Sequence, residues 1–311
     1  MVDVHPELAP AVKRFPNVPI TPRTIKLNRR LFLGLARFLK RGREPTPGVA
    51  MADVIAPGPA GDVPLRVYRP LSAATPTPVI AWIHGGGMIM GTHEDDLQLT
   101  RLADATGATV VSIGYRLAPE HPFPAAHDDL LAAIDHLLAE PERLGIDPAR
   151  MVVGGQSAGG GLAASMAQRL HDRGVALRGQ LLVYPMLDDR TAVRDDIEPT
   201  EHPIWGRTSN HTGWGAMLPN PPGADEQPEH AVPARRDDLT GLAPAWIGVG
   251  TADLFHDEDV AYADRLRAAG VEVTLDVVDD AVHAFEVLVP EAEISKAFVA
   301  SQDEFLRRVL T

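Results

Sequence analysis

Residues 154–161 read Gly-Gly-Gln-Ser-Ala-Gly-Gly-Gly and directly follow the apolar run Met151–Val153. The middle of this stretch fits the pattern Gly-x-Ser-x-Gly, and a small-residue helical pattern continues from it to Leu170. Glycine on both sides of Ser157 suits a sharp strand-to-helix turn, because a larger residue beside the serine would clash. Such a turn can present a nucleophile, although a serine at this place is also common as a helix cap.

Strands and helices are predicted to alternate on both sides of this turn. Short β-branched or apolar runs predict strands, and apolar residues at helical spacing predict helices between them. The predicted strands are 63–68, 78–83, 109–113, 152–153, 180–184, 245–249 and 271–277, and the predicted helices are 95–106, 124–139, 158–170, 256–269 and 291–310. This order predicts an α/β fold, with a mostly parallel sheet and helices on both of its faces.

Two segments depart from this alternation. Residues 188–240 are rich in Pro, Asp, Asn, His and Trp without a clean period, and residues 1–50 are basic and interrupted by proline. An irregular segment of this length is unusual as a plain loop. We therefore expect one domain over residues 1–311, with a cap subdomain from about 1–45 and about 190–240.

Bulk composition limits the classes of partner. The chain has 311 residues, a net charge of −13 and no cysteine. Its basic cluster at residues 37–43 is short, so the acidic chain is expected to bind neither nucleic acid nor an anionic membrane stably. No apolar run is long enough for a membrane span, and the N-terminus lacks a signal-peptide pattern. A cytoplasmic protein is expected.

Further candidate residues follow other predicted strands. Gly85, Gly86 and Gly87 could offer free backbone N–H groups to an oxyanion, with the N–H of Ala158 as another donor, or could form a flexible loop. His283 and Asp253 each come just after a strand, at the sheet edge that Ser157 would share. Asp253 could instead cap the next helix, and Asp257 and Glu258 compete with it as the acid that orients the histidine.

Several motifs together identify a family resemblance. They are His84-Gly85-Gly86-Gly87, the long stretch Tyr115-Arg116-Leu117-Ala118-Pro119-Glu120-His121-Pro122-Phe123-Pro124-Ala125-Ala126, Gly155–Gly160, Tyr184-Pro185, Asp253–Glu258 and His283-Ala284-Phe285. From about residue 50 to its end the chain resembles the hormone-sensitive-lipase-like (bacterial type IV) carboxylesterases of the α/β-hydrolase superfamily. The resemblance implies a central sheet of about eight strands.

The resemblance also implies roles for the candidate residues. Ser157 would be the nucleophile, His283 the general base and then acid, and Asp253 the partner of the histidine. Gly85, Gly86, Gly87 and Ala158 would form the oxyanion hole. The substrate-contacting positions would be Met88, Tyr184, Leu254 and Phe255, and Trp205 and Trp214 are candidate pocket walls in the cap. His84 and His121 would hold loops in place, and Tyr115, Arg116 and Glu120 would form a buried polar network beneath the site. No metal or cofactor is implied.

This chain departs from the family pattern at Gln156 (usually Asp), Leu254 (usually Pro) and Ala284 (usually Gly). None of these changes removes a catalytic group. The predicted function is therefore a serine carboxylesterase acting on small short- to medium-chain acyl esters. The alternatives are a non-catalytic small-molecule receptor on the same fold, or an amide, carbamate or lactone hydrolase. An edge strand near 271–277 could pair with a second copy in a dimer.

Overall fold

A mostly parallel sheet forms the centre of the protein. The computed structural model describes residues 2–14, 18–39, 41–198 and 201–311, and these residues contain an eight-stranded sheet in the order β1-β2-β4-β3-β5-β6-β7-β8. The strands are β1 (Val49–Gly58), β2 (Gly61–Pro70), β3 (Thr77–Ile83), β4 (Thr109–Ile113), β5 (Ile146–Gln156), β6 (Gly179–Val183), β7 (Ala245–Gly250) and β8 (Val273–Val278). β2 pairs antiparallel with β1 and β4, and every other pairing is parallel. The predicted fold class is confirmed.

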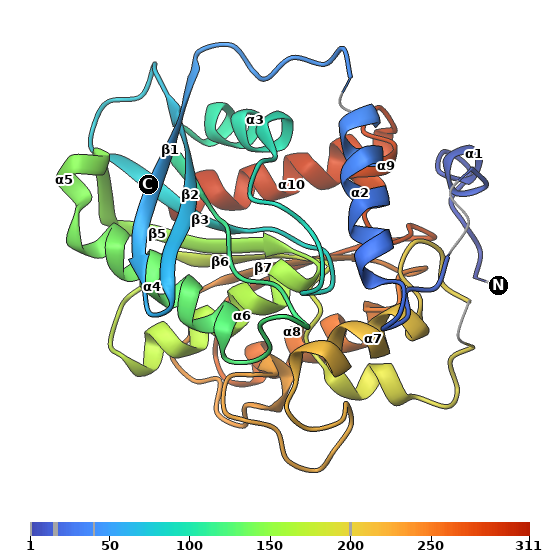
Figure 1. Cartoon of the computed structure of the whole chain (residues 1–311). Coiled ribbons are helices and arrows are strands. Elements are labelled where there is room, and N and C mark those ends of the chain that lie inside the picture. Colours follow the sequence, from blue (N-terminus) through green and yellow to red (C-terminus); the bar gives the residue numbers. More distant parts are fainter. Residues whose placement is uncertain (1, 15–17, 40, 199–200) are drawn as a thin grey trace.

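Helices cover both faces of the sheet (Figure 1). α4 (Ala125–Ala139), α6 (Ala158–Asp172) and α8 (His256–Ala268) bury their apolar side chains on one face, and α3 (Asp96–Thr106) and α10 (Glu293–Val309) bury theirs on the other. The inner strands β4 and β6 are buried along their whole length, which explains why they read as continuous apolar runs. The short helix α1 (Ala9–Val12) comes first in the chain, and the short helices α5 (Pro141–Leu144) and α9 (Phe285–Leu288) join larger elements.

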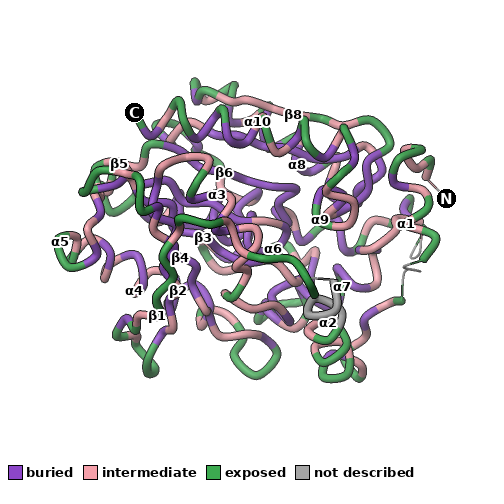
Figure 2. The backbone as a smooth tube through the Cα atoms, turned by 90° about the horizontal axis from the view of Figure 1, so that it is seen from above, coloured by how far each residue is buried: buried purple, intermediate pink, exposed green. Residues whose placement is uncertain are grey.

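The outer strands were harder to predict. β1 was missed because most of its residues are exposed, so no alternation of apolar and polar residues marks it. Figure 2 shows this exposed strand at the rim of a buried centre. β8 lies at the other edge, as predicted, and its pairing with a second copy stays a prediction.

The two irregular segments lie against each other. The N-terminal segment contains α2 (Ile25–Leu39), and residues 188–240 contain the 3-10 turns η1 (Asp189–Val193) and η2 (Pro233–Arg235) and the helix α7 (Arg207–Met217). The N–H of Ile20 donates to Ser209 Oγ at 3.0 Å, and Thr212 Oγ1 donates to the carbonyl of Ile20 at 2.8 Å. Among the helices that the structure describes, none is both long and apolar enough to cross a bilayer.

Candidate active site

Ser157 lies on the tight turn between β5 and α6. Its backbone has φ 56° and ψ −125°, a conformation that L-residues rarely adopt. A Cβ added to Gly155 would lie 2.4 Å from the carbonyl oxygen of Gly159, and one added to Gly159 would lie 2.1 Å from that of Ile83. Glycine at both positions therefore lets α6 begin directly against the end of β3, with Ser157 at the carboxyl edge of the sheet.

A continuous hydrogen-bond chain joins Ser157, His283 and Asp253. His283 Nε2 lies 2.9 Å from Ser157 Oγ, and His283 Nδ1 lies 2.7 Å from Asp253 Oδ2. The three residues follow β5, β8 and β7, so the carboxyl ends of parallel strands bring them together, and all three are buried. Because the carboxylate can only accept, Nδ1 carries the proton, which leaves Nε2 free to accept one from the serine hydroxyl.

The structure separates the three acids that the sequence left in competition. The side chain of Asp257 is 63% exposed and pairs with Arg194 at 2.7 Å. Glu258 is buried, but its Oε1 accepts two backbone N–H groups that follow β6. Of these acids in the described structure, Asp253 alone hydrogen-bonds to His283.

Two aromatic rings pack against the imidazole of His283. The centroid of the Tyr184 ring lies 4.7 Å from the centroid of the imidazole, and the centroid of the Phe255 ring lies 5.3 Å from it. Both contacts are edge to face. Tyr184 Oη donates to Glu286 Oε1 at 2.5 Å, and burial raises the pKa of Glu286 to about 7. These contacts hold the imidazole in place. The predicted substrate-contacting residues Met88, Tyr184, Leu254 and Phe255 are all buried, and their contact with substrate stays a prediction.

The glycine loop after β3 lies beside Ser157. A Cβ added to Gly85 would lie 3.2 Å from Ser157 Cβ, so the two backbones are in close contact. Gly86 and Gly87 adopt φ 113° and 61°. Among the described residues, no acceptor binds the N–H groups of Gly86, Gly87 or Ala158. Free amides of this kind next to a serine can stabilise an oxyanion.

Tryptophan side chains of the inserted segment differ in their surroundings. A Cβ added to Gly87 would lie 2.2 Å from the ring of Trp205, so this ring lies directly on the glycine loop. Trp214 is completely buried within the hydrophobic core. Trp205 therefore lies at the site, as expected of a pocket wall. Trp214 lies in the core instead.

A stacked pair of rings supports the glycine loop. The ring of Tyr115 stacks on His84 at 4.3 Å, and its Oη donates to the His84 carbonyl at 2.9 Å. Desolvation by burial lowers the pKa of His84 to about 4, so the ring is neutral and its Nδ1 donates to the carbonyl of Gly85 at 2.8 Å. The predicted loop-holding role of His84 agrees with these contacts.

The other predicted members of the buried network, Arg116 and Glu120, are not fully buried. Arg116 forms a partly exposed ion pair with Asp129 at 2.8 Å. Glu120 has a side chain that is 40% exposed, and it binds Arg29 of α2. His121, which was predicted to hold a loop in place, is exposed, and that role stays a prediction. These residues follow β4 on the outside of the fold, where charged side chains keep part of their hydration.

Two of the family departures have clear local consequences. Gln156 Oε1 accepts a hydrogen bond from Gln98 Nε2 at 3.0 Å, so a pair of neutral amides lies beside Ser157 where the family pattern has a charged residue. Ala284 adopts φ 57°, a left-handed conformation in which a residue with a Cβ is strained by about 1 kcal/mol. The strain follows from replacing the usual glycine. Leu254 is buried, and nothing further in the structure explains the loss of proline there.

Two contacts near the site had no signal in the sequence. Arg29 of α2 donates to the carbonyl of Ile89, just beyond the glycine loop, at 2.5 Å. The N–H of His5 donates to the carbonyl of Asp280, in the loop that leads to His283, at 2.8 Å. Both contacts join residues far apart in the chain, so no local motif predicts them.

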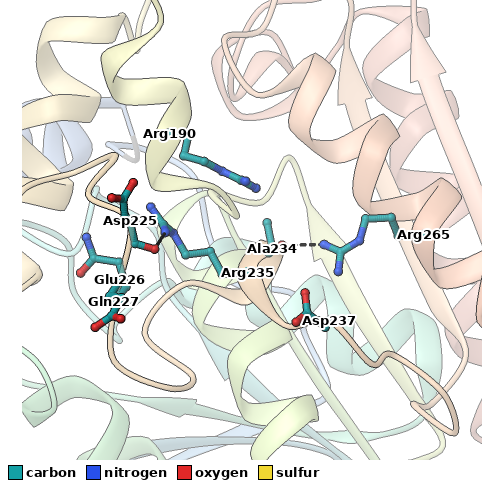
Figure 3. Close-up of a pocket in the computed structure, with 8 residues that line it drawn as sticks. All are labelled: Arg190, Asp225, Glu226, Gln227, Ala234, Arg235, Asp237 and Arg265. Atoms are coloured by element: carbon teal, nitrogen blue, oxygen red, sulfur yellow. Dashed lines mark hydrogen bonds between the residues drawn. The ribbon is translucent and has the colours of Figure 1, made fainter.

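A polar cavity of about 660 Å³ lies elsewhere, between the inserted segment and α8 (Figure 3). Its lining residues are Arg190, Asp225, Glu226, Gln227, Ala234, Arg235, Asp237 and Arg265. Its three arginines already bind protein acceptors, namely Asp188, Asp189 and the carbonyl of Ala234. The lining residues of this cavity are therefore separate from the Ser157 site. Each of its three arginines already has an acceptor within the protein.

One cluster in the described residues has donor atoms near enough for a shared metal ion: Asp172, Glu229 and His230. Arg236 binds both carboxylate oxygens of Asp172, at 2.6 and 2.7 Å. A guanidinium thus already neutralises the carboxylate that a metal ion would need.

Comparison with known proteins agrees with this architecture. A family model described as the alpha/beta hydrolase fold matches residues 80–287. The chain is 38% identical over 239 residues to carboxylesterase NlhH of Mycobacterium tuberculosis, covering 74% of each chain. A solved bacterial heroin esterase superposes with a TM-score of 0.92 at 34% identity, covering 99% of this chain and 98% of that one. Esterase LipW from Mycobacterium marinum gives a TM-score of 0.85 at 34% identity, with the same coverage.

Three observations indicate a common origin with these proteins: the sheet order, the strand-to-helix turn at Ser157 and the segment that matches the family model. The matched segment begins in β3 and ends within α9, so it includes Ser157, Asp253 and His283. The relatives match over about three quarters of their own length or more. The chain therefore belongs to the alpha/beta hydrolase fold family, among its hormone-sensitive-lipase-like members.

Proposed function

We propose that the chain is a serine carboxylesterase that hydrolyses short- to medium-chain acyl esters of small molecules through an acyl-enzyme. The observation that carries this proposal is the hydrogen-bond chain from Ser157 Oγ through His283 to Asp253. Such a chain activates a hydroxyl that is otherwise a weak nucleophile. Similarity to proteins named as carboxylesterases and esterases supports the same reaction.

In the first step Ser157 Oγ attacks the ester carbonyl carbon while its proton passes to His283 Nε2. The negative charge that develops on the carbonyl oxygen is stabilised by the N–H groups of Gly86, Gly87 and Ala158, and the absence of a Cβ at Gly85 lets this loop approach Ser157 closely. The tetrahedral intermediate then collapses. The bond to the leaving oxygen breaks, and that oxygen takes the proton from Nε2.

In the second step a water molecule attacks the acyl-enzyme. His283 Nε2 accepts a proton from the water, and the resulting hydroxide adds to the acyl carbon. Collapse returns the proton to Ser157 Oγ and releases the carboxylic acid. Asp253 stabilises the imidazolium in both steps and fixes its tautomer. All of these groups belong to this chain, so the reaction as proposed uses no metal or cofactor.

We further propose that residues 1–45 and 190–240 form a cap over this site. The hydrogen bonds between Ile20 and α7 support a joint unit, and the position of Trp205 on Gly87 supports its location over the oxyanion loop. Ser157 is only 7% exposed, which fits a covered site. Met88 and Trp205 would then border the acyl group and limit the chain length.

The rate of p-nitrophenol release from acetyl, butyryl, octanoyl and palmitoyl esters tests the proposal. The wild type should prefer the shorter esters, and Ser157→Ala should abolish turnover. Ser72→Ala, at an exposed serine far from the turn, is the matched control and should keep full activity. A wild type no faster than Ser157→Ala would overturn the esterase proposal and leave the receptor alternative.

Labelling with an organophosphate tests the nucleophile separately. Peptide mass spectrometry should find a single adduct, on Ser157. An adduct on another serine would refute the assignment even if esterase activity were present. Parallel assays with anilide and lactone substrates distinguish an esterase from an amidase or lactonase, because all three would use the same nucleophile.

A further inference from the structure

Positive charge is concentrated in the N-terminal segment of this acidic chain. Residues 13–43 hold ten of the 29 lysines and arginines and none of the 42 acidic residues. The basic region is therefore much longer than the cluster at 37–43. The negative net charge of the whole chain does not reveal it. It includes α2, which lies on the outside of the molecule in both views (Figures 1 and 2).

The outward surface of α2 combines apolar and basic side chains. Leu27 and Leu31, one helical turn apart, are 58% and 60% exposed, and both rank among the most exposed large apolar residues described. Lys26 directly precedes Leu27, Arg30 directly precedes Leu31, and both basic residues are exposed as well. Val18, just upstream, is 64% exposed. An apolar stripe flanked by cations is typical of a helix that lies at a lipid–water interface.

The opposite surface of α2 is fixed to the body of the protein. Ile25 is buried, and Arg29 donates to the carbonyls of Ile89 and Ala118 and binds Glu120. The helix therefore cannot rotate to bury its leucines without breaking these contacts. Leu27 and Leu31 stay exposed unless something outside the described chain covers them.

We propose that the outward face of α2, formed by Lys26, Leu27, Arg30 and Leu31, docks reversibly on an anionic lipid surface. The cations attract the head groups, and the leucines enter the interface between head groups and acyl chains. A nucleic acid would attract the cations but would leave the leucines exposed. A second copy bound symmetrically through this face would bring two basic segments together and would be repelled. The acidic remainder of the chain would be repelled by the lipid, so the basic face alone would approach it.

Co-sedimentation of the full-length protein with vesicles tests this proposal. We expect binding to vesicles of phosphatidylcholine mixed with phosphatidylglycerol, release at high salt, and no binding to phosphatidylcholine alone. The double variants Leu27→Asp/Leu31→Asp and Lys26→Gln/Arg30→Gln should each lower the partition coefficient by about tenfold or more. Circular dichroism and melting temperature check that each variant folds.

Matched controls lie on other surfaces. Leu71→Asp changes a 69% exposed leucine in the turn after β2, at the sheet edge away from Ser157. Arg143→Gln/Arg173→Gln removes two exposed cations elsewhere. Both should bind vesicles like the wild type. Equal losses in the controls, or unchanged binding by the α2 variants, would overturn the proposal. So would a wild type that ignores vesicles but binds an oligonucleotide, or a dimer that the leucine variant converts to monomer.

Discussion

Replacement of Asp253 by asparagine should disable the enzyme while preserving its shape. Both carboxylate oxygens of Asp253 accept N–H groups: Oδ2 from His283 Nδ1 at 2.7 Å and Oδ1 from the backbone of Phe255 at 3.0 Å. Asparagine has one acceptor oxygen. If that oxygen keeps the Phe255 N–H, the NH2 group faces Nδ1, which must then lose its proton. Nε2 carries the proton instead and cannot accept one from Ser157.

The expected loss follows from this change of tautomer. We expect kcat/KM to fall by about 10⁴-fold, which corresponds to about 5 kcal/mol of lost transition-state stabilisation. The side chains of aspartate and asparagine have nearly the same shape, so the melting temperature should change little. Hydrolysis of p-nitrophenyl butyrate and thermal unfolding measure the two quantities.

Asp257→Asn is the matched control, because it makes the same chemical change four residues away. Its carboxylate is 63% exposed and pairs with Arg194, and an exposed ion pair contributes about 1 kcal/mol or less. Its activity should stay within severalfold of the wild type. The reasoning fails if Asp257→Asn is the crippling variant, or if Asp253→Asn loses less than tenfold.

Three further predictions concern Gly86 and two buried carboxyl groups. Gly86→Ala would place a Cβ 2.3 Å from the carbonyl oxygen of Met90, so we expect kcat/KM to fall by about 10²-fold or more; an unchanged rate would remove Gly86 from the oxyanion hole. Burial raises the pKa of Glu286 to about 7, so the folded state keeps the proton of this carboxyl to a higher pH than the unfolded state does. The free energy of unfolding should therefore fall as the pH rises from about 4.5 to 7, by on the order of 3 kcal/mol. Glu286→Gln should flatten this dependence in urea unfolding at pH 5 and 8, and an equal slope would contradict the assignment. Burial also raises the pKa of Asp259, whose oxygens have no hydrogen-bond partner among the described residues, so Asp259→Asn should raise the melting temperature more at pH 8 than at pH 5. A gain that is the same at both pH values would show that ionisation is not the cause.

The sequence was most informative where the backbone itself requires particular residues. Gly155 and Gly159 leave room for a strained turn, and apolar runs of buried strands locate the sheet edge at which Ser157, Asp253 and His283 meet. Predicting that edge needed only the order of strands and helices. Choosing among Asp253, Asp257 and Glu258 needed coordinates, because all three lie within two helical turns and local sequence does not say which carboxylate faces inward.

Long-range and surface features escaped prediction for physical reasons. β1 pairs with the sheet on one side only and is mostly exposed, so its sequence carries no burial pattern. Glu120 sits in a motif but turns to solvent and to Arg29, a partner 91 residues away. The burial of Asp259 is equally invisible, because an acidic residue in the first turn of a helix is ordinarily explained by the helix dipole.

The hydrogen bond between His5 and Asp280 bears on how the protein should be handled. A purification tag fused to the N-terminal segment would add bulk near His5, whose N–H binds the loop that leads to His283, and should slow the enzyme without unfolding it. The chain ends at Thr311, on the opposite side of the molecule in both views (Figures 1 and 2). A tag or a resin linkage placed there would leave the N-terminal segment undisturbed, and comparing the turnover of the two fusions would show how much the contacts of residues 5–12 support the loop of His283.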